Sequence, residues 1–236
     1  MIRISDLPRL AAREPIETIP IGLLSPELFK NEFQTPSKPV ILHSEFNEPR
    51  LAATADVDIF NQIRVDSYLK KINAHTGLRR KRLIAWRPQT LTLGGIDPLH
   101  LSGHDATLVQ LQGKSRVILF PPHVTHNLYP LIRPLERFAS YSSEVDLDCP
   151  NLNKFPKFKQ ALTEVRISNL DEGQTLYIPI GWWHAMQATS LDSVRFVHAA
   201  WKVEPIFRYR ICPRAAYLGI IDMMSILKRP IISPDT

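Results

Sequence analysis

Two histidines occupy positions where local geometry would direct an imidazole into a site. His100 begins a stretch of alternating polarity just after Gly94-Gly95, and His184 ends the segment YIPIGWWH. A histidine on a strand is more often a hydrogen-bonded structural group than a ligand, so local geometry has to single it out. Here a glycine turn and a proline turn do so. Because imidazole nitrogens bind transition metals, His100 and His184 are the candidate metal ligands.

Short strands are the elements that would position these histidines. Residues 107–112 alternate, Gly113 permits a tight turn, and residues 115–120 form a second apolar run, which together predict a β-hairpin. Four further strands are expected at residues 38–42, 163–168, 174–179 and 193–198. Several short strands spaced in this way predict a sandwich or a barrel.

Helices are expected around the strands. Ser25 followed by a proline predicts a capped helix over residues 25–33, and apolar spacing indicates others at 58–72 and 151–162. Residues 213–228 carry a broad apolar face at helical spacing. We expect this face to pack on its own domain, with homodimer formation as the second interpretation.

The composition indicates one domain in a reducing compartment. A chain of 236 residues with 44% apolar side chains can bury one sizeable core. Two cysteines, Cys149 and Cys212, are too few for a disulfide framework and lack the paired spacing of a zinc site. The N-terminus has no apolar run of signal-peptide length, so we expect a cytoplasmic protein without membrane insertion.

The formal charge of +6 comes in large part from one basic run, Arg79, Arg80, Lys81 and Arg82. The first interpretation of this run is a solvated loop. The alternative is contact with an anionic partner such as nucleic acid, although no aromatic side chains interleave the run to stack on bases.

Four stretches together resemble the Jumonji C and cupin-like oxygenases. These are TPSKPVIL (35–42), LVQLQGKSRVILFPP (108–122), DLDCPNLNKFPKF (146–158) and GQTLYIPIGWWH (173–184). Members of that family use iron(II) and 2-oxoglutarate on a double-stranded β-helix. The resemblance therefore implies a mainly β, cupin-type jelly roll with flanking helices and a C-terminal helix. It covers residues 35–203, leaving an N-terminal helical extension at 1–34 and a C-terminal helical segment at 204–236.

The resemblance also implies a metal site with one altered position. In the family a His-x-Asp pair and a distant histidine bind the iron, and alternate residues of a strand face the same ion. His100 and His184 match the two histidines, whereas Ser102 stands in place of the carboxylate. A neutral hydroxyl is a poor ligand for iron(II), so weaker metal binding is expected.

The cosubstrate positions are altered as well. The basic residue that pairs with the distal carboxylate of 2-oxoglutarate in the family corresponds to Ser115, with Lys114 one residue earlier. Lys114 would point to the other face of a regular strand, unless a bulge near Gly113 turned it inward. Two asparagines that frame the cosubstrate correspond to Ala106 and His198. His198 is either a substitute ligand or a packed core histidine.

Three functions remain open from the sequence. The first is an iron(II)- and 2-oxoglutarate-dependent hydroxylase acting on a protein, peptide, RNA or small molecule. The second is a non-catalytic member that serves as a binding or scaffold protein. The third is a two-histidine iron enzyme with altered, halogenase-like chemistry, in which the small Ser102 leaves room for a halide. No residue is assigned a catalytic role beyond metal and cosubstrate binding.

Overall fold

Strands make up most of the computed structural model, which describes residues 16–43, 57–78, 83–131, 140–190 and 194–201. The basic run at 79–82 and the C-terminal segment at 204–236 lie outside the described residues, as do the anionic contact and the homodimer expected from them. None of the helices in the described ranges is long and apolar enough to cross a membrane.

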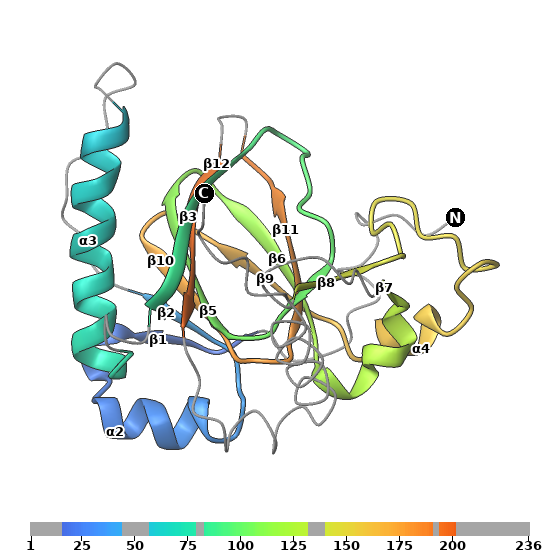
Figure 1. The fold of residues 1–236 in the computed structure, drawn as a ribbon, viewed down its shortest axis with the longest axis horizontal. Coiled ribbons are helices and arrows are strands. Elements are labelled where there is room, and N and C mark those ends of the chain that lie inside the picture. The colour runs from blue at the N-terminus through green and yellow to red at the C-terminus, as the bar shows by residue number, and fades with distance from the viewer. Residues whose placement is uncertain (1–15, 44–56, 79–82, 132–139, 191–193, 202–236) are drawn as a thin grey trace, which may run out of the picture.

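Two six-stranded sheets face each other (Figure 1). The first sheet has the order β1 (Thr18–Pro20), β2 (Val40–His43), β10 (Gln174–Ile178), β5 (Asp105–Gln112), β12 (Val194–Trp201), β3 (Leu83–Leu91). The second has the order β7 (Pro130–Leu131), β8 (Ser140–Ser143), β4 (His100–Ser102), β11 (Trp183–Ala188), β6 (Ser115–Phe120), β9 (Arg166–Leu170). Neighbours in each sheet come from distant parts of the chain, as expected of a jelly roll. The mainly β, cupin-type fold is therefore confirmed.

The helical elements lie outside the two sheets. They are η2 (Ile21–Leu23), α2 (Pro26–Phe29), η3 (Lys30–Gln34), α3 (Val57–Thr76), η5 (Pro122–Leu128) and α4 (Phe158–Leu162). The Ser25 hydroxyl accepts a hydrogen bond from the backbone N–H of Leu28, so the expected N-cap of α2 is confirmed. The N-terminal extension is not wholly helical, because β1 pairs with β2 in parallel at the edge of the first sheet.

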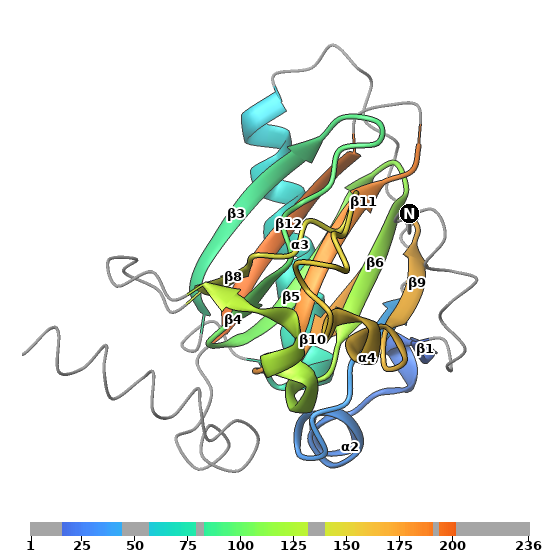
Figure 2. The same cartoon turned by 90° about the vertical axis from the view of Figure 1, so that its right-hand side faces the viewer.

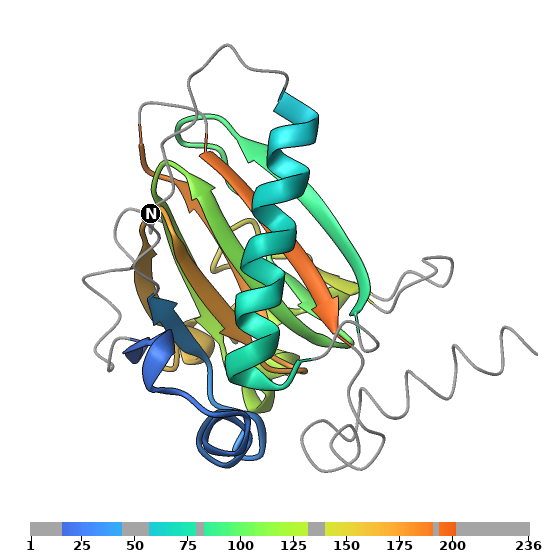
Figure 3. The same cartoon turned by 90° about the vertical axis from the view of Figure 1, so that its left-hand side faces the viewer.

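Three apolar cores hold these layers together. Ala106, Leu108, Val117, Leu119 and Met186 belong to the core between the sheets. A second core joins α2 and α3 to the outer face of the first sheet, and α3 lies across that face in Figure 3. A third joins η5 and α4 to the outer face of the second sheet, seen in Figure 2. Each sheet is therefore buried on both faces over much of its area.

The expected hairpin of residues 107–112 with 115–120 is wrong. Both runs are strands, β5 and β6, but β5 pairs with β10 and β12 in the first sheet whereas β6 pairs with β11 and β9 in the second. Gly113, with φ of 74°, turns the chain from one sheet into the other. Each strand already has a neighbour on both edges, so the two runs do not pair with each other. They face each other across the interior, where Ser115 of β6 contacts Gln110 of β5.

Two boundaries also differ from the expected ones. Helix α4 covers only Phe158–Leu162, because Pro150 and Pro156 interrupt the region before it. Strand β9 begins at Arg166 and not at residue 163, because residues 163 and 164 continue the turn after α4.

Candidate metal site

His100 and His184 are direct cross-strand neighbours in the second sheet. Strand β11 pairs antiparallel with β4, and the register places His184 opposite His100. Side chains at paired positions share one face of the sheet. The two imidazole ring centres consequently lie 4.1 Å apart, so the structure brings together the two histidines that the sequence singled out.

Both imidazoles present the same nitrogen to the site. Nδ1 of His100 lies 2.8 Å from the Pro98 carbonyl oxygen, and Nδ1 of His184 lies 3.3 Å from that of Trp182. Since a carbonyl oxygen only accepts, Nδ1 carries a proton in both rings, and the neutral ring of His184 keeps a lone pair on Nε2. Nε2 of His184 is buried and has no hydrogen-bond partner. Backbone carbonyls that fix the tautomer in this way are typical behind metal-binding histidines.

The spacing of the two rings fits one shared ion. Imidazoles that bind an ion at about 2.0–2.1 Å and occupy adjacent positions have ring centres about 4 to 5 Å apart. The observed 4.1 Å lies in that range. The unpartnered Nε2 of His184 and the spacing of the pair therefore fit a divalent metal.

The third ligand position is weaker. Ser102 lies two residues after His100 on β4, hence on the same face of the strand, and is partly buried. It brings a hydroxyl and no charge to this position. Across the described ranges, no group of three or more histidine, cysteine, aspartate or glutamate residues is arranged to hold a metal ion. The protein thus offers two good ligands and one poor one.

His198 joins the cluster from the opposite sheet. It stands on β12, with its ring centre 5.9 Å from that of His184 and 6.5 Å from that of His100. Both distances are longer than the ring-centre separation of about 4 to 5 Å expected for two imidazoles bound at adjacent positions of one ion. His198 therefore lies beside the candidate site but not in the position of a third ligand.

Burial controls the charge of the inner histidine. Burial, followed by the proximity of the His100 and His198 imidazoles, lowers the pKa of His184 well below its usual range, although its bond to Trp182 opposes the shift. His184 is therefore neutral at physiological pH, as a metal ligand must be. An Asp97 oxygen lies 3.7 Å from Nδ1 of His100. Burial raises the pKa of Asp97, and His100 opposes that shift.

The turn before His184 is fixed from several sides. Gly181 has φ of 89°, a conformation that favours glycine. The Trp182 indole N–H donates to the Ser37 carbonyl oxygen, and that of Trp183 donates to the Thr125 hydroxyl. The two indoles are anchored in different cores, between the sheets and outside the second sheet. This turn therefore holds the start of β11, and with it His184, in place.

Asp105 ties the same turn to the first sheet. One carboxylate oxygen accepts from the backbone N–H of Ile180 at 2.9 Å, and the other accepts from the Tyr177 hydroxyl and the Gln34 amide. Asp105 is almost fully buried. Asp105 therefore acts as a structural carboxylate that joins the turn to the first sheet.

The positions implied for the cosubstrate form a neutral, buried pair. Ser115 lies on the inward face of β6, and its hydroxyl donates to the side-chain oxygen of Gln110 on β5 at 3.0 Å. The Gln110 amide in turn donates to the backbone oxygen of Gln112 at 2.8 Å. Gln110 was missed in the sequence, although its alternation with Ala106 and Leu108 would have placed it on the inward face.

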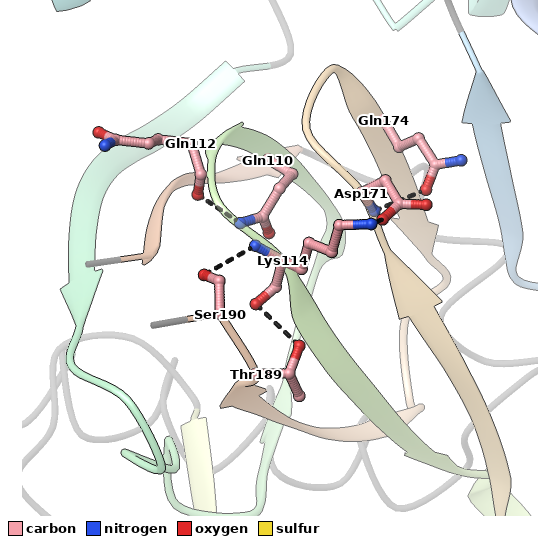
Figure 4. A network of polar contacts seen from close by, with 7 residues as sticks. All are labelled: Gln110, Gln112, Lys114, Asp171, Gln174, Thr189 and Ser190. Carbon is pink, nitrogen blue, oxygen red and sulfur yellow. Dashed lines mark hydrogen bonds and ion pairs between the residues drawn. The ribbon is translucent and has the colours of Figure 1, made fainter. Parts of the chain in front are cut away.

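Lys114 lies on the outside of the protein. Its ammonium pairs with Asp171 at 3.0 Å, and the lysine side chain is 68% exposed (Figure 4). Its backbone is held by Thr189 and by Ser190, which accepts from the Lys114 N–H. The pairing of β5 with β12 does shift register at Gln110 and Gln112, just before Gly113, but this irregularity does not turn Lys114 inward.

Comparison with known proteins agrees with this geometry. Residues 87–202 match the family described as Cupin-like domain. These residues form a cupin-like domain. The match spans both histidines, the candidate cosubstrate positions and strands from both sheets, and it confirms the resemblance found in the sequence.

The relatives of the cupin-like domain are longer proteins. Human HSPB1-associated protein 1 is 37% identical over 111 residues, which is 47% of this chain and 22% of that protein. Lysine-specific demethylase 8 of Xenopus tropicalis is 36% identical over 104 residues, 44% of this chain and 22% of that protein. The chain thus aligns with less than a quarter of the length of these relatives.

Two solved structures show more distant likenesses. E. coli ycfD shares 15% identity at a TM-score of 0.36, covering 70% of this chain and 37% of its own. Oxalate decarboxylase of Bacillus subtilis shares 14% identity at a TM-score of 0.32, covering 52% of this chain and 22% of its own. Likenesses at these scores support no inference about activity.

The cupin-like domain fits a metal better than it fits 2-oxoglutarate. A neutral, buried imidazole with an unpartnered Nε2, beside a second imidazole at 4.1 Å, suits a divalent ion. Ser115, by contrast, is uncharged and bonded to Gln110, and Lys114 is paired outside with Asp171. Among the residues whose side chains the structure describes, no lysine or arginine is buried. The residues assigned to 2-oxoglutarate by the resemblance therefore do not suit a dicarboxylate.

Proposed function

We propose that the cupin-like domain holds an iron(II) ion between His100 and His184 and acts as an oxygenase of the Jumonji C and cupin-like type. The observation that carries the proposal is the buried, unpartnered Nε2 of His184 beside a second imidazole at 4.1 Å. Leaving such a nitrogen unpaired costs about 1 to 3 kcal/mol, which a bound ion would recover.

Each residue near the pair has a definite task in this proposal. His100 and His184 bind the ion, and the carbonyl oxygens of Pro98 and Trp182 keep their Nδ1 atoms protonated. Ser102 adds a weak ligand or leaves that position to solvent or substrate. Bound iron(II) would supply the centre at which molecular oxygen is activated. With only two strong protein ligands, several coordination positions remain open.

Protein side chains are the first substrate class to test. The Xenopus relative carries the name lysine-specific demethylase, as does JMJ30 of Arabidopsis thaliana, which is 33% identical over 140 residues. These names describe the relatives, whose aligned segments are a minority of their length. For this chain a methylated lysine peptide is accordingly a starting probe, before RNA or small molecules.

Anaerobic titration with iron(II) tests the proposal. We expect one ion to bind per chain in the parent protein and in a His123→Ala control, since His123 is an exposed residue at the start of η5. A His184→Ala variant should lose this binding. Equal affinity of His184→Ala and the parent would refute the assignment.

A non-catalytic binding protein is the second candidate. It is favoured by the coincidence of Ser102 at the carboxylate position with the Ser115 to Gln110 bond at the cosubstrate position. Under this alternative the folded parent binds no iron(II) at millimolar concentration. The same titration therefore separates the two functions.

A further inference from the structure

The interior between β5 and β6 is closed by a hydrogen-bonded pair that spans the two sheets. Gln110 belongs to the first sheet and Ser115 to the second, and both side chains are completely buried. Their bond of 3.0 Å crosses the interior just before the turn at Gly113. Figure 4 shows Gln110 turned back to the Gln112 carbonyl, beside the backbone of Lys114.

This pair leaves little for an incoming anion to bind. The Ser115 proton is donated to Gln110, and one amide proton of Gln110 is donated to Gln112. A carboxylate would have to break these bonds and remain buried without a cation, which is strongly unfavourable. The lysine nearest along the chain, Lys114, is on the outside with Asp171.

The surrounding core fills the same space with apolar groups. Val117 and Leu119 follow Ser115 on the inward face of β6, and Ala106 and Leu108 precede Gln110 on β5. These four side chains are also buried. Among the side chains that the structure describes around the Gln110 to Ser115 pair, an anion would thus meet apolar groups and no cation.

We infer that the Gln110 to Ser115 pair closes this end of the barrel, so that the domain does not bind 2-oxoglutarate there. This inference does not depend on the proposed metal site. One consequence is practical, because assays that follow consumption of 2-oxoglutarate will not report on this protein.

Calorimetric titration of 2-oxoglutarate tests the inference. It is titrated into the metal-free parent and into the parent loaded with manganese(II). We expect no binding in either case at millimolar 2-oxoglutarate. Binding by either form of the parent would overturn the inference. The titration of the metal-free protein tests closure of the barrel even if the protein turns out to bind no metal. Binding of 2-oxoglutarate by the manganese-loaded protein would contradict closure without contradicting the metal site.

A Ser115→Lys variant makes the test sharper. A cation at this inward position gives a carboxylate a charge-assisted partner. We therefore expect Ser115→Lys to bind 2-oxoglutarate at least about ten-fold more tightly than the weakest binding that the titration can detect. A Lys114→Ala variant, which removes only the outer lysine, should behave as the parent does. A folded Ser115→Lys protein that still binds nothing would overturn the role given to this position. Should that variant fail to fold, Ser115→Ala replaces it, because it removes the hydroxyl and with it the bond to Gln110. Measurable binding of 2-oxoglutarate by Ser115→Ala would support closure by the pair, and a folded Ser115→Ala protein that binds nothing would overturn the role given to the hydrogen bond.

Discussion

Ser102 sets the limit on how tightly the histidine pair can hold an ion. It lies on the same face of β4 as His100, which makes it the side chain best placed to add a third ligand. A carboxylate there would contribute both a bond and a negative charge. The hydroxyl contributes neither to the same degree, and His198 lies too far from His100 to compensate.

Restoring the carboxylate should strengthen metal binding. For Ser102→Asp we predict an iron(II) affinity at least about ten-fold above that of the parent, measured by anaerobic calorimetry. The matched control is Ser102→Asn, which has the same shape without the charge and should gain much less. Equal gains in the two variants would show that size and not charge governs this position.

His184 should make stability depend on pH. Its pKa in the folded protein is well below the ordinary value of 6.5, so the unfolded chain binds a proton there that the folded chain does not. Stability should therefore be unaffected above pH 6.5 and fall as the pH drops below it, by up to about 1.4 kcal/mol per pH unit.

Urea denaturation of the metal-free protein between pH 7.5 and pH 5.5 measures this dependence. The comparison is His184→Asn, which keeps a polar side chain but does not titrate. If the free energy of unfolding falls equally with pH in the two proteins, His184 is not the source of the acid sensitivity.

At the scale of elements, the turn of residues 179–183 depends on a carboxylate from another strand. Asp105 begins β5 in the first sheet, yet it binds Ile180 just before β11 of the second. It also accepts from the buried Tyr177 hydroxyl. The turn that leads to the histidine on β11 is thus held by a residue 75 positions before Ile180 in the chain.

Removal of this carboxylate should be costly. Asp105→Ala leaves the Tyr177 hydroxyl and the Ile180 N–H buried without their acceptor, so we predict a loss of about 3 to 5 kcal/mol in the free energy of unfolding. Asp146→Ala, which removes an exposed carboxylate that accepts only from a nearby backbone N–H, should cost about 1 kcal/mol or less. Urea denaturation distinguishes the two, and similar losses would contradict the structural role of Asp105.

The sequence predicted six of the twelve strands that the structure describes, but not their partners. Alternation and turn residues located β5, β6, β10 and β12, because those signals are local. Pairing was missed for β5 and β6, since the short turn at Gly113 resembles a hairpin turn. The partners that decide the sheet lie much further along the chain, as with Thr107 opposite Tyr177 and Leu119 opposite Arg166. The same limit hid the Gln110 to Ser115 bond.

The candidate site was predictable to a similar extent. His100 and His184 were singled out by their turns and by the resemblance, and the register of β4 with β11 brings them together. Asp97 carried no signal, because its approach to His100 depends on how the loop before β4 folds. The orientation of Lys114 was left open between two faces, and its pairing with Asp171 resolves it.

In the whole molecule, the helix that packs on the first sheet lies apart from the candidate metal site on the second. Helix α3 packs its buried Tyr68, Leu69 and Ile72 on the outer face of the first sheet, whereas the histidine pair belongs to the second. Weakening the α3 contact should therefore reduce stability without altering the metal site of the folded protein.

An Ile72→Ala variant tests this separation. Loss of the buried side chain should lower the free energy of unfolding by about 2 to 5 kcal/mol, while Lys70→Ala on the exposed face should change it little. Iron(II) affinity, measured well below the melting temperature, should match the parent in both. A lowered affinity in folded Ile72→Ala would show that the first sheet and its helix shape the metal site directly.

Nitrogen NMR of the imidazoles tests the central claim most directly. In protein with ¹⁵N-labelled histidine, His100 and His184 should both carry a proton on Nδ1. Zinc(II), a diamagnetic substitute for iron(II), should shift their Nε2 signals together at one equivalent while leaving His123 unchanged. If zinc leaves the signals of His100 and His184 in place, or shifts only one of them, the pair does not hold a shared ion.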